Sequence, residues 1–192
     1  PNDVSKKYGD DDPVFDYTFE GAVGDEIPVG NISLERESGE NVGNYALSLS
    51  STSSLSNHTQ SGFYARNYTL QIAQDSFFEI EKRELVLTFT KQLSKKVGES
   101  DPVLEFEFDN KVAGEEPSYT GSLARESGES VGHYLITAGN FCLIDNLSAN
   151  FLASNYCFRL EEGYLYITTG TLDASSFVSS KSSTYNGQMQ YV

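Results

Sequence analysis

Short segments of alternating apolar and polar residues run through the whole chain. In residues 15–19, three aromatic residues alternate with Asp16 and Thr18. A period of two places the apolar side chains on one face of an extended backbone, so each such segment is a predicted half-buried strand. The same alternation occurs at 45–49, 68–72, 78–80, 85–89, 104–108, 134–136, 156–160 and 165–167. Strands at this density, separated by short turns, predict a mostly β protein.

The predicted strands belong to a sequence repeat. Residues 36–45 read RESGENVGNY and residues 125–134 read RESGESVGHY, which gives eight identical positions of ten at an offset of 89. Pro13 and Pro28 recur at the same offset as Pro102 and Pro117. Self-similarity at a fixed offset indicates tandem modules of one fold, because each copy repeats the same strands and turns.

The repeat divides the chain into three predicted parts. The first module comprises residues 1–83 and lacks the opening strand that 85–89 supplies to the second module, residues 84–170. Residues 171–192 start a third module, and we expect further repeats of the same polypeptide. The connections between modules are short, which predicts modules arranged end to end with restricted hinging.

The repeated motif predicts a tight turn that leads into a strand. Its members are Arg36, Gly39, Gly43 and Tyr45 in the first module and Arg125, Gly128, Gly132 and Tyr134 in the second. Glycine adopts positive φ without steric cost, which fits a turn at these positions. Arg36 stands beside Glu37, and the pair predicts a surface ion pair of structural use.

These motifs resemble those of a known family. The opening at residues 7–13, the Arg-Glu-x-Gly-x-x-x-Gly-x-Tyr centre at 36–45 and the step Asn67-Tyr68 are similar to the MBG domain of the YGX type. The second copy departs from the pattern at Val97, where the family has Tyr. The resemblance implies a β-grasp-like fold, and an immunoglobulin-like β-sandwich is the alternative because periodicity does not separate the two.

The same resemblance implies a cellular location. MBG modules occur in long tandem arrays in bacterial surface and adhesin-like proteins, so we expect an extracellular or secreted cell-surface segment with a role linked to cell adhesion. The family supplies no catalytic residues. The sequence itself contains no recognisable pair of nucleophile and base, and we expect neither an enzyme nor a cofactor.

The charge of the chain excludes two classes of partner. The chain has 28 acidic and 13 basic residues, for a formal net charge of −15. Nucleic acids and anionic lipid surfaces repel such a protein. No stretch approaches the roughly 20 apolar residues of a membrane helix, so membrane insertion is not expected.

Two groups of residues are candidates for metal binding or a covalent bridge. The run Asp10, Asp11 and Asp12 is a weak calcium candidate because Ca²⁺ prefers clustered carboxylates; the alternative is a turn ahead of Pro13. Cys142 and Cys157 both lie in the second module. They predict either a disulfide in an oxidising compartment or two free thiols.

Two functions agree with these observations. The first is a stalk or spacer that projects another part of the protein. The alternative is a binding module for a host glycan or protein such as mucin, which would need an exposed aromatic surface. Tyr164 and Tyr166 alternate with the apolar Leu165 and Ile167 and are the predicted binding residues; cross-strand aromatic packing is the structural explanation for the same pair.

Overall fold

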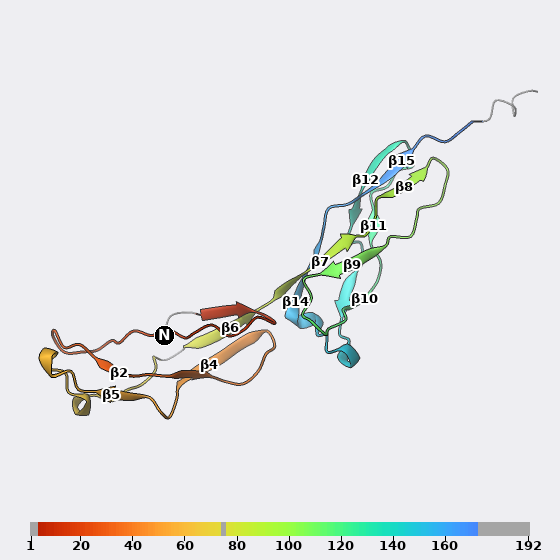
Figure 1. Ribbon diagram of the computed structural model, residues 1–192. Helices are drawn as coiled ribbons and strands as arrows, with labels where there is room; N and C mark the ends of the chain where they lie inside the picture. The colour runs from red at the N-terminus through yellow and green to blue at the C-terminus, as the bar shows by residue number, and fades with distance from the viewer. Residues whose placement is uncertain (1–3, 74–75, 173–192) are drawn as a thin grey trace, which may run out of the picture.

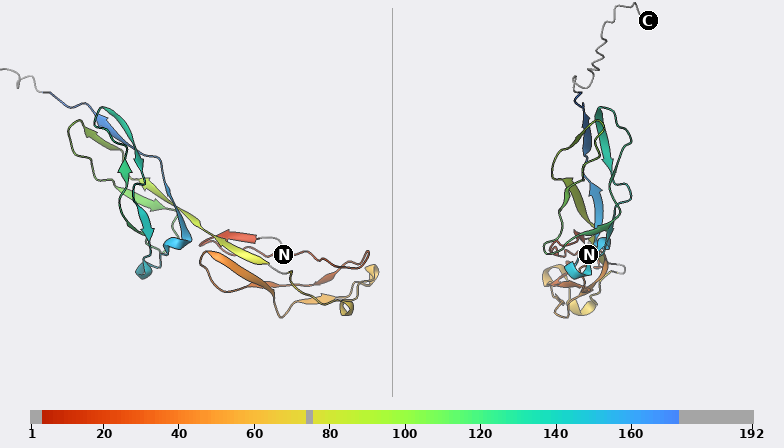
Figure 2. Two further views of the ribbon diagram at one scale, coloured as in Figure 1. Left: turned by 180° about the vertical axis from the view of Figure 1, so that it is seen from behind. Right: turned by 90° about the vertical axis from the view of Figure 1, so that its right-hand side faces the viewer.

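The computed structural model describes residues 4–73 and 76–172 (Figure 1). These residues form fifteen β-strands and four short 3-10 turns, and no α-helix occurs among them. Two elongated modules lie end to end and meet where β6 (Phe77–Glu81) is followed by β7 (Arg83–Phe89), as the views in Figures 1 and 2 agree. The predicted mostly β fold and the tandem arrangement are confirmed.

The main sheet of the first module has four strands in the order β1-β6-β4-β3. The N-terminal strand β1 (Val4–Lys7) runs parallel to β6, whereas β4 (Gly43–Leu49) is antiparallel to β6 and to β3 (Leu34–Arg36). At the end of the first module that lies away from the second module, β2 (Val29–Asn31) pairs with β5 (Ser54–Ser56), next to the 3-10 turns Thr59–Ser61 and Ala65–Asn67 (Figure 1).

The second module repeats this plan. Its main sheet has the order β11-β12-β15-β8, built from β8 (Leu93–Lys96), β11 (Ala124–Arg125), β12 (Gly132–Thr137) and β15 (Tyr164–Thr168). Strand β8 is parallel to β15, as β1 is to β6. The small pair consists of β10 (Ser118–Thr120) and β13 (Cys142–Ile144), and the turns are Leu147–Ala149 and Ala153–Asn155.

One sheet exists only in the second module. Strand β7 lies between β14 (Tyr156–Leu160), to which it is parallel, and β9 (Phe106–Asp109), to which it is antiparallel. The counterparts of β9 and β14 in the first module were predicted as strands at 15–19 and 68–72. That prediction is wrong: neither segment forms a strand. An extended segment is stabilised by a neighbour's hydrogen bonds, and in the second module the shared neighbour is β7.

The apolar faces of the strands form three buried clusters. The main sheet of the first module buries Leu47, Phe78 and Ile80, and that of the second buries Leu93, Ile136, Leu165 and Ile167. A third cluster contains Leu85 from β7 together with Phe151 and Tyr156. The alternating pattern therefore identified the buried faces of both main sheets.

The strand directions bear on the two predicted folds. An immunoglobulin-like sandwich is built from antiparallel sheets, whereas the modules contain the parallel pairs β1–β6, β8–β15 and β7–β14. Each main sheet therefore contains both parallel and antiparallel pairs. The only helical elements among the described residues are 3-10 turns.

No helix in the described part of the chain has the length and apolarity that a membrane crossing requires.

Candidate functional site

The repeated motif builds an ion-pair cluster at the same place in each module. In the first, the ion-pair cluster consists of Lys6, Asp12, Arg36 and Glu40. Lys6 Nζ lies 2.6 Å from Asp12 Oδ1 and 2.6 Å from Glu40 Oε2, and Arg36 Nε lies 2.6 Å from Asp12 Oδ2. Arg36 also pairs with Glu40. The Lys6 side chain is 5% exposed, so this ammonium is buried but paired with two carboxylates.

The second module repeats the cluster with Lys95, Asp101, Arg125 and Glu129. Lys95 Nζ lies 2.7 Å from Asp101 Oδ1, and Arg125 Nε lies 2.7 Å from Asp101 Oδ2. Hydrogen bonds from Arg125 and Lys95 lower the pKa of Asp101 to about 2. In the first module, the bond from Arg36 holds the pKa of Asp12 below its usual range.

The predicted surface pair between Arg36 and Glu37 is wrong. The Arg36 guanidinium donates to the backbone carbonyls of Glu37 and Gly39, and its carboxylate partners are Asp12 and Glu40. It also lies 5.2 Å from the centre of the Tyr45 ring. A planar guanidinium with five donors suits this shared position between carboxylates, carbonyls and a ring.

The motif glycines provide room for the tyrosine ring. Gly39 has φ +146°, and a Cβ there would lie 2.5 Å from Cε1 of Tyr45. Gly128 has φ +148°, and a Cβ there would lie 2.2 Å from the same atom of Tyr134. The Tyr45 hydroxyl donates to the Asn41 carbonyl at 2.6 Å. The motif thus forms a packed turn, in which Gly43 and Gly132 also have positive φ.

The calcium candidate does not form a ligand set. Asp12 belongs to the ion-pair cluster, while Asp10 Oδ1 lies 2.7 Å from Arg83 Nη1. No cluster of three or more metal-ligating side chains occurs in residues 4–73 and 76–172. Cationic side chains of the chain itself therefore pair with two of the three carboxylates, those of Asp10 and Asp12.

The predicted disulfide is not formed. Cys142 lies on β13 and Cys157 on β14, in different sheets, and both are free, exposed thiols. Each thiol lies near a backbone carbonyl, that of Leu143 and that of Arg83 respectively. Sequence spacing placed both residues on strands, but it could not place those strands in one sheet.

The predicted binding residues Tyr164 and Tyr166 lie on β15 and share one face with His133 of β12. The ring centres of His133 and Tyr164 are 5.4 Å apart, and those of His133 and Tyr166 are 6.5 Å apart. Tyr166 is 40% exposed. Tyr164 and Tyr166 border a hollow of about 230 Å³ near Phe89 and Gly163. The three rings form an aromatic patch at the surface.

A set of contacts that the sequence did not reveal joins the two modules. We call this set the junction. Its residues are Tyr8, Gly9, Asn41 and Val42 of the first module, Arg83 at the start of β7, and Val112, Glu115, Asn155 and Tyr156 of the second module.

A buried carboxylate lies at the centre of the junction. Glu115 is 5% exposed and accepts hydrogen bonds from Tyr8 and from Tyr156, whose hydroxyl lies 2.5 Å from Oε2. The two tyrosine rings meet edge to face with centres 5.5 Å apart. Burial, together with the Glu115 carboxylate, raises the pKa of Tyr8 to about 12 and also raises that of Tyr156.

Polar contacts surround this centre. The Asn155 side chain, 1% exposed, accepts from the Val42 amide at 3.0 Å and donates to Asn41 Oδ1 at 3.0 Å. On the other side, Arg83 donates to the Tyr8 carbonyl at 3.1 Å and pairs with Asp10. The two modules thus contact each other at three separate points, at Glu115, Asn155 and Arg83.

Gly9 permits this close approach. A Cβ at Gly9 would lie 2.3 Å from Cγ2 of Val112 across the junction. In the second module, where Val97 replaces the tyrosine, a Cβ at Gly98 would have no neighbour within 4 Å. The Tyr-Gly step at residues 8–9 therefore touches the following module, and Tyr8 also packs against the buried cluster of its own main sheet.

Comparison with known families finds two MBG domains in the chain; the predicted third module, residues 171–192, lies outside both matches, and its residues 173–192 lie outside the described residues. A model of the MBG domain (YGX type) matches residues 1–78 and again residues 85–166. The chain belongs to this family. Neither a search of curated proteins nor a search of solved structures found a match. The MBG domain is a structural or binding repeat module of surface proteins.

In this MBG pair, the Tyr-Gly step at residues 8–9 forms part of the contact between the modules. Sequence reasoning identified Tyr8 and Gly9 as part of the family pattern but not their partners, which lie more than 100 residues away. A signal was present: Glu26 and Glu115 recur at the repeat offset, as do Asn67 and Asn155. In the first module Glu26 accepts a hydrogen bond from Tyr68, as Glu115 does from Tyr156.

Proposed function

We propose that this MBG pair is a stiff, non-catalytic spacer in an adhesin-like array at a bacterial cell surface. The observation that supports the proposal is the buried Glu115, which binds tyrosines of both modules at once. A buried carboxylate is costly unless its hydrogen bonds are satisfied, so separation of the modules is penalised. A single residue, Lys82, stands between β6 and β7, which leaves a short connection.

The test measures how widely the angle between modules varies. Spin labels are placed at V14C and V103C, two exposed and equivalent positions, in a chain whose two cysteines are replaced by serine. Pulsed electron resonance should give one narrow distance distribution. Glu115→Ala should broaden it, because Tyr8 and Tyr156 lose their shared acceptor.

Glu26→Ala is the matched control. It removes the equivalent carboxylate of the first module, which binds Tyr68 and lies outside the junction. If Glu115→Ala fails to fold, Tyr8→Phe provides a second test, because it removes one hydroxyl of the junction and keeps the ring. A broad distribution in the unmodified chain, or equal widths for Glu115→Ala and Glu26→Ala, would reject the spacer.

A second function, binding of a host glycan or protein such as mucin, is supported by the aromatic patch. Tyr164 and Tyr166 present ring faces beside His133 at the surface. Sugars and proteins commonly bind exposed aromatic rings. Saturable binding to immobilised mucin that is lost in Tyr164→Ala and Tyr166→Ala, and retained in Phe77→Ala at the equivalent surface of the first module, would favour this function. Binding that survives both substitutions would exclude the patch.

A further inference from the structure

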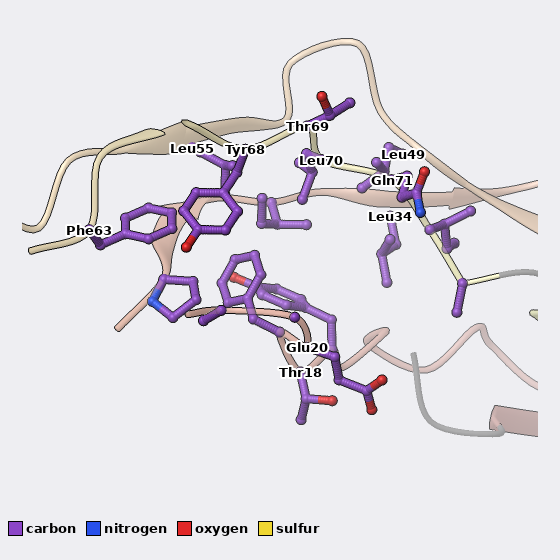
Figure 3. A pocket seen from close by; sticks show the side chains of 18 residues that line it. Thr18, Glu20, Leu34, Leu49, Leu55, Phe63, Tyr68, Thr69, Leu70 and Gln71 are labelled. Carbon is purple, nitrogen blue, oxygen red and sulfur yellow. The ribbon is translucent and has the colours of Figure 1, made fainter. Parts of the chain in front are cut away.

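A long groove opens in the first module. It has a volume of about 450 Å³ and runs between residues 17–22 on one side and 68–73 on the other (Figure 3). Its floor is apolar and contains Leu34, Leu49, Leu55 and Phe63. The groove lies beside the main sheet, where the second module has its additional sheet.

Both sides of the groove are extended segments without a partner strand. Residues 17–20 and 69–72 make no backbone hydrogen bond to another segment within the described part of the chain. Unpaired N–H and C=O groups along an extended backbone are a template for an added strand. The groove therefore offers hydrogen bonds on two sides and an apolar floor.

The second module shows what occupies the equivalent space. There β7 lies between β9 and β14, with Leu87 opposite Phe108 and Leu85 opposite Phe158. Leu85 and Leu87 are fully buried. The side chains around Leu85 include Phe108, Leu143, Phe151 and Tyr156.

The lining of the groove matches that environment residue for residue. The counterparts of Phe108, Leu143, Phe151 and Tyr156 are Phe19, Leu55, Phe63 and Tyr68, at offsets of 89 and 88. All four line the groove. The first module thus keeps the apolar side chains that surround a leucine of β7, without the strand that carries the leucine.

We propose that the groove is a binding site for one β-strand of the β7 type, parallel to 68–72 and antiparallel to 17–20. The ligand is an extended segment with two leucine-like side chains at alternate positions, supplied by polypeptide on the N-terminal side of Val4. The connection supports this source: β7 is followed after three residues by β8, and the counterpart of β8 is β1, which begins at Val4. Such a strand would complete the first module as β7 completes the second.

The test adds the strand as a peptide. A synthetic peptide with the sequence of residues 83–90, RELVLTFT, is mixed with the whole chain, and amide hydrogen exchange is followed by mass spectrometry. Exchange should slow about tenfold or more at 17–20 and 68–72, because new strand hydrogen bonds protect those amides. The equivalent segments 106–109 and 156–160 should not change, since β7 already occupies their sheet.

Two controls keep the test specific. A peptide with Leu85 and Leu87 both replaced by Asp has the same backbone but cannot enter an apolar groove. In the protein, Leu55→Asp changes the floor and should weaken binding of the original peptide about tenfold or more.

Several outcomes would overturn the proposal. These are no protection at millimolar peptide, equal protection by the Asp-substituted peptide, equal protection in both modules, or protection of 17–20 and 68–72 before peptide is added. The junction at Glu115 lies apart from the groove. The width of the spin-label distance distribution therefore tests the spacer function independently of whether the peptide binds.

Discussion

Arg36 and Arg125 show how one residue can organise a turn. Each guanidinium binds an aspartate 24 residues earlier, a glutamate four residues later and the carbonyls between them. Lysine has a compact ammonium without this planar fork and cannot make the same set of bonds. The repeat therefore keeps arginine at this position for geometry as well as charge.

Gly39→Ala should destabilise the first module by about 1–3 kcal/mol. The residue has positive φ, and the added Cβ would overlap the Tyr45 ring. Urea unfolding measures the change. Gly21→Ala is the control, because Gly21 has φ +85° and nothing within 4 Å of the added carbon. Equal losses for the two variants would show that contact with Tyr45 contributes nothing.

Acid should weaken the second module through Asp101. Because its folded-state pKa is lowered to about 2, this carboxyl contributes stability that is fully present above its unfolded value near 4 and is lost as pH falls through about 2. The urea midpoint should therefore drop between pH 4 and pH 2. Asp101→Asn should flatten that drop, whereas Asn at the exposed Asp25 should not. An unchanged pH profile in Asp101→Asn would contradict the assignment.

At the residue scale, the sequence predicted the motif but not its partners. It placed Arg36, Gly39 and Tyr45 in one turn, and they do form one. It paired Arg36 with its sequence neighbour Glu37. The carboxylates that Arg36 binds include that of Asp12, which lies 24 residues earlier in the sequence and close to Arg36 in the folded chain. Local spacing predicts turns well because turns are local, and it gives no information on a partner supplied by another strand.

Strand formation in this protein depends on neighbours. The alternating pattern at 15–19 equals that at 104–108, yet only the second module forms the corresponding strand, Phe106–Asp109. The pattern reports which side chains can share a face. Whether the backbone becomes a strand depends on hydrogen bonds from an adjacent segment. The alternation at 15–19 therefore could not predict whether an adjacent strand would pair with it.

Leu85→Ala should destabilise the second module by about 2–5 kcal/mol, since this side chain is fully buried in a cluster with Phe151 and Tyr156. Thermal or urea unfolding monitors the loss. The control is Val103→Ala, at a position 82% exposed, where a change within about 0.5 kcal/mol is expected. A small effect at Leu85 would mean that β7 does not organise its sheet.

The junction joins the two modules through buried and partly buried side chains. Its contacts join positions far apart in the sequence, 75 residues for Arg83 with Tyr8 and more than 100 for Tyr8 with Glu115, so no repeat analysis of a single module could find them. The matched pairs Glu26/Glu115 and Tyr68/Tyr156 nevertheless recur in both copies. Only the second copy has the tyrosine of a preceding module within reach.

Alkaline solution should loosen the junction. The pKa of Tyr8 is raised to about 12, so its contribution to stability is complete below the unfolded value near 10 and disappears as pH rises through about 12. Between pH 8 and 12, the difference in urea midpoint between the unmodified chain and Tyr8→Phe should shrink toward zero. Tyr17→Phe, outside the junction, provides the control. A difference that stays constant would exclude ionisation of Tyr8 as the cause.

The parallel pairing of first and last strands has a mechanical consequence. Strand β1 runs parallel to β6, and β8 runs parallel to β15. The chain therefore enters the first strand and leaves the last strand of each pair at opposite ends of their shared ladder of hydrogen bonds. Tension along the chain then shears the ladder, and all its hydrogen bonds resist together instead of opening one by one. A tether between a cell and a moving surface would gain resistance to pulling from this strand order alone.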